Sequence, residues 1–356
     1  MTSYPLLRPT GFVDSPFGHD GKVARLAGGL NWFASVELIH PDGVRELVPV
    51  EGIEVRFDEA QAATWARLTA PRAALQLGER TIRLDQPQVM GIVNATPDSF
   101  SDGGQFADAR DAAEAGMTMA AAGAAMIDVG GESTRPGAKD VWEGDEIERV
   151  LPVIRQLAAG GTAVSVDTRK AAVIEAALGA GARLVNDVSA LTFDDRSLEV
   201  VAAAGVPVVL MHHQGDPQSM QDAPRYDDVL VEVYHWLGQR IAAAEAAGIS
   251  RTNILVDPGI GFGKSLAHNL TLLNGLALFH GLGCPIVVGA SRKRMIGALA
   301  NEAPSDQRLS GSLALALKAA DQGVQMIRVH DVPETVQALK VWRGLRDQAL
   351  TPRLQS

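Results

Sequence analysis

Short apolar runs alternate with alanine-rich stretches of helical periodicity from Val89 to about Trp342, and we count eight such pairs. This alternation predicts a parallel sheet whose strands are joined by helices. The runs are almost continuously apolar, as expected of strands that are covered on both faces. We expect strands at Val89–Asn94, Ala125–Val129, Ala163–Asp167, Leu184–Asp187, Pro207–His212, Ile254–Asp257, Pro285–Gly289 and Met326–Val329. The predicted helices include Ala109–Ala122, Glu146–Ala159, Lys170–Ala180, Asp227–Ala247 and Leu309–Gln322.

Eight strand–helix pairs favour one closed architecture, an α/β fold of the (β/α)8 TIM-barrel type over residues 87–348. The alternative is an open doubly wound sheet, which usually has fewer strands and a G-x-G-x-x-G turn after the first one. Here Asn94 is followed by ATPDSFSDGG, a long polar loop that does not fit that turn. We therefore predict the barrel.

The chain before the barrel, residues 1–86, has a different pattern and predicts an N-terminal accessory segment rich in β-structure. A hairpin is expected between Trp32 and Arg56, with its turn at Pro41-Asp42-Gly43. Asp58 is placed to cap a short helix, and Leu75 to Leu84 alternates like a second hairpin. Residues 349–356 are expected to form a C-terminal tail.

Composition narrows the class of protein. The 356 residues carry 32 Lys and Arg against 42 Asp and Glu, and no basic stretch is dense enough for nucleic acid. We expect no signal peptide at the N-terminus and no run of about 20 apolar residues that would span a membrane. The single cysteine, Cys284, fits a buried structural thiol in a reducing compartment. These features predict a cytoplasmic protein that binds neither nucleic acid nor membranes.

Polar residues recur where the predicted strands end, at the rim where barrel enzymes place their chemistry. A single Asn or Asp there is equally well explained as a helix cap or turn residue. The same pattern at eight strands indicates a shared ligand. The residues are Asn94, Asp128, Asp167, Asn186, His212, Asp257, Lys293, Arg328 and His330.

These residue types limit the chemistry. Arg and Lys beside Asn, Ser and Thr suit a phosphorylated anion, and an Asn or Asp oxygen suits Mg²⁺ that keeps phosphate and water as further ligands. Buried carboxylates can accept two N–H donors from the edge of a guanine or pterin ring. No G-x-S-x-G occurs, and Cys284 precedes its strand, so covalent catalysis is not indicated.

Two weaker signals are interpreted conservatively. His212 and His213 are adjacent on a strand and point to opposite sides, which disfavours a shared zinc ion. The segment from Gly259 to Lys264 does not meet the G-x-x-x-x-G-K-[ST] spacing of a phosphate-binding loop. We expect a tight loop that lets Phe262 face the site.

Two segments, MGIVNATPDSFSDGG at Met90–Gly104 and IDVGGESTRPG at Ile127–Gly137, closely resemble the signature regions of dihydropteroate synthases. The resemblance covers Val89 to about Arg346. It continues through SVDTRK at Ser165, LVNDVSAL at Leu184, LMHHQGDPQSMQ at Leu210, LVDPGIGFGK at Leu255, GASRKRMIG at Gly289, RLSGSLA at Arg308 and IRVHDV at Ile327.

The resemblance implies a Mg²⁺-dependent transferase of folate biosynthesis. It would condense 6-hydroxymethyl-7,8-dihydropterin pyrophosphate with p-aminobenzoate, giving 7,8-dihydropteroate and pyrophosphate. The resemblance also implies a homodimer and a target of sulfonamides.

Site residues follow from the same resemblance. The pterin would contact Asp128, Asp167, Asn186, Met211, Asp257, Phe262 and Lys293. Pyrophosphate would be held by Asn94, Thr134, Arg328 and His330, with Asn94 also at the metal. The p-aminobenzoate pocket would comprise Phe100, Thr134, Arg135, Pro136, Ser291 and Lys293. The catalytic set would be Asn94, Asp167, Lys293, Arg328 and His330.

Two rival functions share the pterin-facing residues, namely a pterin-binding methyltransferase and a catalytically silent pterin-binding paralogue. Ser291-Arg292-Lys293 and Arg328-Val329-His330 argue against the methyltransferase, because they suit a pyrophosphate that it never meets. The silent paralogue is disfavoured because Asn94, Lys293, Arg328 and His330 are retained. Two positions depart from the common family pattern. His213 stands where Met is frequent, and Arg294, where Ser is frequent, would either bind the p-aminobenzoate carboxylate or point to solvent.

Overall fold

The computed structural model describes residues 5–95, 105–133, 140–215 and 223–351, and for 105–108 the backbone alone. Eight parallel strands form one sheet in the order β12-β11-β10-β9-β8-β7-β14-β13. Val256 of β12 forms a parallel bridge with Ile286, just before β13, and this contact closes the sheet into the predicted barrel. The strands are β7 (Gln88–Asn94), β8 (Met126–Gly130), β9 (Val164–Asp167), β10 (Leu184–Asp187), β11 (Val208–Met211), β12 (Ile254–Asp257), β13 (Val287–Val288) and β14 (Met326–Val329).

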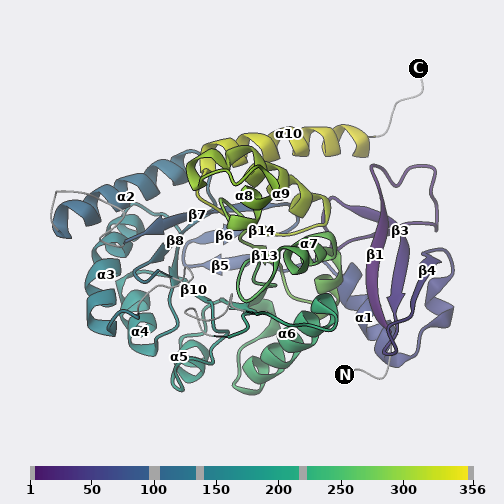
Figure 1. Cartoon of the computed structure of the whole chain (residues 1–356), viewed down its shortest axis with the longest axis horizontal. Coiled ribbons are helices and arrows are strands. Elements are labelled where there is room, and N and C mark those ends of the chain that lie inside the picture. Colours follow the sequence, from purple (N-terminus) through teal and green to yellow (C-terminus); the bar gives the residue numbers. More distant parts are fainter. Residues whose placement is uncertain (1–4, 96–104, 134–139, 216–222, 352–356) are drawn as a thin grey trace.

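Helices surround the sheet (Figure 1). They are α2 (Gln105–Ala121), α3 (Glu143–Ala159), α4 (Ala171–Ala180), α5 (Ser197–Ala204), α6 (Val229–Ala246), α7 (Leu266–Asn274), α8 (Arg294–Leu299), α9 (Leu309–Asp321) and α10 (Val332–Leu350), with short 3-10 segments η3 (Arg251–Asn253), η4 (Leu276–Leu282) and η5 (Ser305–Gln307).

Every predicted strand is present, and the largest difference from the predicted bounds is at β13, which is two residues long. Pro285 has no N–H to donate and the N–H of Ile286 donates to the side chain of Gln325, so pairing with β14 begins at Val287.

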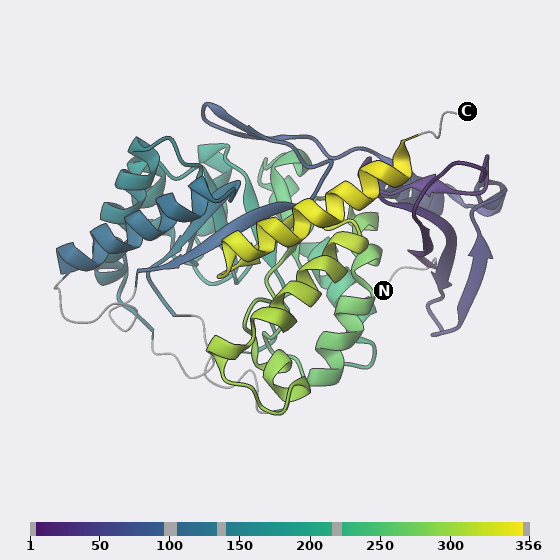
Figure 2. The same ribbon diagram turned by 90° about the horizontal axis from the view of Figure 1, so that it is seen from above.

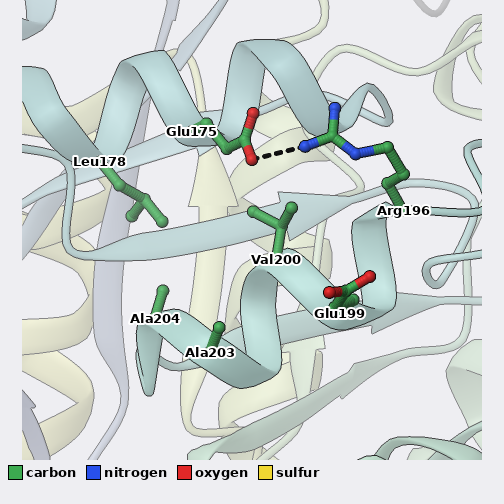
Figure 3. A pocket seen from close by; sticks show the side chains of 7 residues that line it. All are labelled: Glu175, Leu178, Arg196, Glu199, Val200, Ala203 and Ala204. Carbon is green, nitrogen blue, oxygen red and sulfur yellow. Dashed lines mark hydrogen bonds and ion pairs between the residues drawn. The ribbon is translucent and has the colours of Figure 1, made fainter.

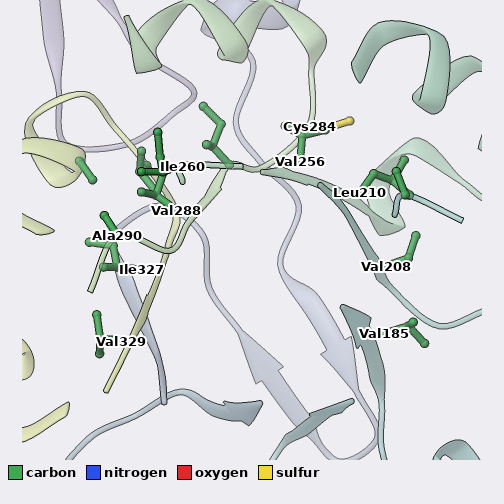
Figure 4. Packing of buried hydrophobic residues seen from close by; sticks show 14 of the residues in the cluster. Val185, Val208, Leu210, Val256, Ile260, Cys284, Val288, Ala290, Ile327 and Val329 are labelled. Atoms are coloured by element: carbon green, nitrogen blue, oxygen red, sulfur yellow. The ribbon is translucent and has the colours of Figure 1, made fainter. Parts of the chain in front are cut away.

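Side-chain alternation divides the barrel core into an inner and an outer cluster. One buried residue from each strand, or the position before it, points inward: Met90, Met126, Ala163, Leu184, Val209, Leu255, Val287 and Met326. These residues pack against Leu75, Leu77, Ile82 and Leu84 around the hairpin of β5 (Leu75–Leu77) and β6 (Arg80–Ile82). The hairpin therefore closes the N-terminal end of the barrel. The intervening strand residues, such as Val208, Val256 and Ile327, pack outward with the helices (Figure 4).

An antiparallel sheet lies to one side of the barrel (Figure 2). Its strands are β1 (Leu6–Val13), β2 (Ala24–Arg25), β3 (Trp32–Ile39) and β4 (Arg45–Pro49), followed by η1 (Ile53–Arg56) and α1 (Glu59–Thr69). The predicted hairpin is β3–β4, and the side chain of Asp58 accepts a hydrogen bond from the backbone N–H of Gln61 at 2.8 Å, as expected of a cap. Pairing of β1 with β3 was not predicted. Among the helices described, none is both long and apolar enough to cross a membrane.

Candidate active site

Polar side chains form a layer directly above the apolar inner layer of the barrel. Because side chains alternate along a strand, residues two positions beyond the inner apolar ones face the same interior. Five of these eight positions are polar, namely Asp128, Ser165, Asn186, Asp257 and Arg328, and the other three are Ile92, Met211 and Gly289. Asp167 lies two residues beyond Ser165 and faces the same way. Ser165 was not among the predicted residues, although its spacing from Asp167 could have identified it.

Arg328 joins two carboxylates at the centre of this layer. Its Nε donates to Oδ2 of Asp128 and its Nη2 to Oδ2 of Asp167, both at 2.6 Å. Asn186 donates from Nδ2 to the same Asp128 oxygen at 2.9 Å. Among the described residues, Oδ1 of Asp128, Oδ1 of Asp167 and Oγ of Ser165 are buried without a hydrogen-bond partner. Buried acceptors in this state favour a ligand that brings N–H donors.

The same contacts influence the pKa values of Asp167 and Arg328. Loss of hydration, aided by the nearby Asp128, raises the pKa of Asp167 to about 7 despite the attraction of Arg328. The two carboxylates raise the pKa of Arg328, so its guanidinium stays charged. The centre of the mouth therefore holds a fixed cation beside a carboxyl group that titrates near neutrality.

The glycine-rich loop after β12 lies beside Asp257 and Lys293. Oδ1 of Asp257 accepts from the backbone N–H of Gly259 at 2.7 Å. The Lys293 ammonium lies 4.4 Å from the ring centroid of Phe262 and donates to the backbone oxygen of Ile260. Burial lowers the pKa of Lys293 to about 8, whereas burial raises that of Asp257. Asp257, Phe262 and Lys293 thus lie together.

The loops that follow the last two strands are linked to each other. The backbone N–H of His330 donates to Oγ of Ser291 at 3.2 Å, and Nδ1 of His330 lies 3.1 Å from the same oxygen. Next to this contact Arg292 pairs with Asp331. Ser291, Lys293 and His330 are therefore brought to one side of the mouth.

Asn94 could contribute one ligand to a metal at this mouth. Asn94 ends β7 and is half-buried, and one amide oxygen suits Mg²⁺ whose remaining ligands are phosphate and water. Among the described residues no group of three or more His, Cys, Asp or Glu is arranged to hold a metal. His212 and His213 both lie against the ring of Trp236 but have separate hydrogen-bond partners, since Nδ1 of His212 lies 2.9 Å from Nζ of Lys264 and Nδ1 of His213 lies 3.1 Å from the oxygen of Gly215.

Other predicted residues fall outside the mouth or outside the described chain. Phe100, Thr134, Arg135 and Pro136 lie outside the described residues. Arg294 is exposed at the start of α8, which agrees with the solvent-facing alternative. Cys284 is fully buried, and burial raises the pKa of its thiol to about 12.

A surface hollow on the outside of the barrel differs from the mouth in chemistry. It lies between α4 and α5 and is lined by Glu175, Leu178, Arg196, Glu199, Val200, Ala203 and Ala204 (Figure 3). Glu175 and Arg196 pair with each other at 2.7 Å, and both are half exposed. The converging buried carboxylates and cations of the mouth make it the stronger candidate for a ligand site.

Known proteins with this fold share the site region. The family of pterin binding enzymes matches residues 90–330. The dihydropteroate synthase of Escherichia coli (strain K12) is 51% identical over 262 residues, which are 73% of this chain and 92% of that protein. The dihydropteroate synthase of Neisseria meningitidis serogroup B is 45% identical over 280 residues, 77% of this chain and 98% of that protein.

Solved structures agree with these relatives. The dihydropteroate synthase of Xanthomonas albilineans with 4-aminobenzoic acid has a TM-score of 0.74 and 48% identity, and the match covers 79% of this chain and all of that one. The Yersinia pestis dihydropteroate synthase in a sulfonamide drug complex has a TM-score of 0.73 and 48% identity, covering 77% of this chain and 99% of that one. The unmatched part of this chain corresponds in length to the segment before the barrel.

Proposed function

The chain belongs to the pterin-binding enzyme family, among the dihydropteroate synthases, and we propose that it condenses 6-hydroxymethyl-7,8-dihydropterin pyrophosphate with p-aminobenzoate. The products are 7,8-dihydropteroate and pyrophosphate, so the enzyme is a transferase of folate biosynthesis. The observation that carries the proposal is a pair of buried carboxylate oxygens, on Asp128 and Asp167, which have no donor in the described part of the chain and lie beside the cations Lys293 and Arg328. The carboxylate oxygens match a ring with N–H groups along one edge, and the cations match an anionic leaving group on the same molecule.

The pterin lies in the inner polar layer. The carboxylates of Asp128, Asp167 and Asp257 accept hydrogen bonds from its N–H groups. The Asn186 amide forms a hydrogen bond with an acceptor or donor on the ring. Met211 and Phe262 contact its faces. Arg328 uses two of its five N–H donors on carboxylates, so its remaining edge is left for the diphosphate.

The leaving diphosphate is held by the cationic side of the mouth. Asn94, Thr134, Arg328 and His330 hold it beside the ammonium of Lys293, and Asn94 would also hold Mg²⁺, which would neutralise phosphate charge. As the C–O bond breaks, the buried carboxylates stabilise the positive charge that develops on the pterin methylene. The arylamine is neutral at pH 7, so its nitrogen lone pair forms the new C–N bond without a strong base on the protein. The electron pair of the C–O bond leaves with the pyrophosphate, which takes up the proton that the nitrogen then loses. Phe100, Thr134, Arg135 and Pro136, with Ser291 and Lys293, form the p-aminobenzoate pocket and exclude water.

The assembly and location of the enzyme are proposed with its function. We propose a cytoplasmic homodimer that forms through the outer helices. Val341 and Leu345 lie one turn apart on α10 and are 62% and 68% exposed, an apolar pair suited to burial against a second copy. Light scattering after chromatography is expected to give twice the mass of the chain.

A pyrophosphate-release assay with both substrates tests the function against its rivals. The proposed enzyme releases pyrophosphate only when p-aminobenzoate is present, whereas a methyltransferase or a silent paralogue releases none. Asp257→Ala is expected to abolish pterin binding, and near-normal turnover by that variant would make the pocket assignment wrong. A sulfonamide is expected to compete with p-aminobenzoate, and insensitivity at high concentration would contradict the proposed pocket.

A further inference from the structure

Lys264 is the last residue of the glycine-rich loop and is buried at the edge of the mouth. Among the described residues, no carboxylate forms an ion pair with it. Its exposed fraction is 2%. Nζ lies 2.9 Å from the backbone oxygen of Phe262, 2.9 Å from Nδ1 of His212 and 3.4 Å from the backbone oxygen of His212. Burying an amine without a counter-charge costs solvation free energy. We therefore expect its hydrogen bonds to stabilise the particular arrangement of the segments that they join.

These contacts join two segments that are far apart in sequence. His212 follows β11, and the loop from Gly259 to Lys264 follows β12. The two backbones approach closely, because a Cβ at Gly259 would overlap the carbonyl oxygen of His212, and one at Gly263 would overlap that of Gln214. Gly259 and Gly263 also have φ of +68° and +61°, which glycine adopts at little cost. The buried side chain of Lys264 connects the two segments through its contacts with His212 and Phe262.

The loop held in this way carries parts of the proposed pterin pocket. The backbone N–H of Gly259 donates to Asp257, and the ring of Phe262 lies under the ammonium of Lys293. Lys293 also donates to Ile260 of the same loop. A shift of the loop would therefore move the acceptor, the ring face and the cation together.

We propose that Lys264 is a positioning residue for pterin binding, which it serves by holding the glycine-rich loop against His212 while making no contact with the ligand itself. The inference rests on the proposed function, because it assigns the loop to the pterin.

The hydrogen bonds hold in either protonation state of the lysine. An ammonium donates to all three partners, with Nδ1 of His212 as an acceptor; a neutral amine donates to the two carbonyls and accepts from an Nδ1–H. Burial lowers the pKa of Lys264 well below its ordinary value, while Asp257 raises it and Lys293 lowers it further. Burial lowers the pKa of His212 to about 2, so its ring stays neutral. Positioning therefore does not depend on pH.

The test measures the dissociation constant of 6-hydroxymethyl-7,8-dihydropterin by calorimetry for the wild type and Lys264→Met, which keeps the length but removes the donors. We expect the dissociation constant to rise about tenfold or more, by the same factor from pH 6 to 9, while the KM for p-aminobenzoate at saturating pterin rises by a smaller factor, because Lys293 is the loop contact that this pocket shares. Tyr226→Phe, which removes the bond from the phenol to the oxygen of Gly263 at 3.0 Å, is expected to weaken binding by a smaller factor.

Arg72→Met is the matched control, since Arg72 is a buried cation whose guanidinium donates to the backbone oxygens of Arg67, Ala70 and His280, away from the mouth. It is expected to lower stability and leave the dissociation constant unchanged. A folded Lys264→Met with wild-type affinity would overturn the inference. If that variant does not fold, wild-type affinity in Tyr226→Phe overturns it instead. A wild type that neither binds the pterin nor turns over would refute the proposed function rather than the positioning role.

Discussion

Arg328 on the last strand of the barrel pairs across the mouth with Asp167 on the third, Nη2 to Oδ2 at 2.6 Å. This ion pair occupies one carboxylate oxygen and leaves the other, Oδ1, without a partner among the described residues. The pair therefore orients Asp167 while keeping an acceptor for a ligand. It also places a permanent cation near the position where the diphosphate is proposed to leave.

The pH dependence of kcat/KM for the pterin substrate should be bell-shaped. Asp167 must be ionised to accept N–H donors, and its pKa is raised to about 7, so kcat/KM rises as the pH increases through that value. Lys293, whose pKa is lowered to about 8, loses its charge at higher pH, so kcat/KM falls there. Steady-state rates from pH 5.5 to 9.5 measure both limbs. Asp167→Asn should remove the acidic limb and Lys293→Arg the alkaline one, and a flat wild-type profile would refute both assignments.

Gly259→Ala should abolish pterin binding. The new Cβ would overlap the carbonyl oxygen of His212 and would also sit at a φ of +68°. Gly205→Ala is the control, because Gly205 has a φ of +65° and open space around its Cβ position. The control should lose only about 1–2 kcal/mol of stability and keep its affinity. Calorimetry and thermal unfolding compare the two, and equal affinities would mean that the loop tolerates displacement.

Lys170→Met should destabilise the protein by about 3–5 kcal/mol, because it leaves buried carboxylates without their counter-charge. Nζ of Lys170 donates to Glu146 at 2.6 Å and to Glu132 at 3.0 Å, and Glu146 is 0% exposed. Arg196→Met, which breaks an exposed pair with Glu175, should cost at most about 1 kcal/mol. Urea unfolding gives both values. A similar small loss in the two variants would show that water reaches Glu146.

Asn31→Ala should weaken the attachment of the N-terminal segment without changing catalysis. Its Nδ2 donates to the backbone oxygens of Ala320 and Asp321 at the end of α9, at 2.9 and 2.7 Å, where carbonyls lack the partners they would have inside a helix. We expect a loss of about 1–3 kcal/mol with kcat/KM unchanged, since the contact is remote from the mouth. Asn253→Ala, which loses one exposed bond to Gly205, is the control for stability. A fall in kcat/KM at unchanged stability would instead indicate that the segment acts on the active site.

The sequence by itself determined the barrel and the identity of most mouth residues. Strands covered on both faces are apolar throughout, and polar residues such as Asp167 and Asp257 stand out at their ends because the pattern is local. Even the hairpin at Pro41-Asp42-Gly43 and the cap at Asp58 depend only on neighbouring residues.

Contacts between distant residues were decided by the tertiary structure alone. The Arg328–Asp128 and Lys264–His212 contacts join residues 200 and 52 positions apart, and β1 adds to β3 through backbone bonds that need no particular side chain. Local pattern identifies which residues are polar, but the partner of each donor depends on which strands the closed sheet makes neighbours. For that reason the contact of Lys264 with His212 depends on β11 and β12 being neighbours in the barrel.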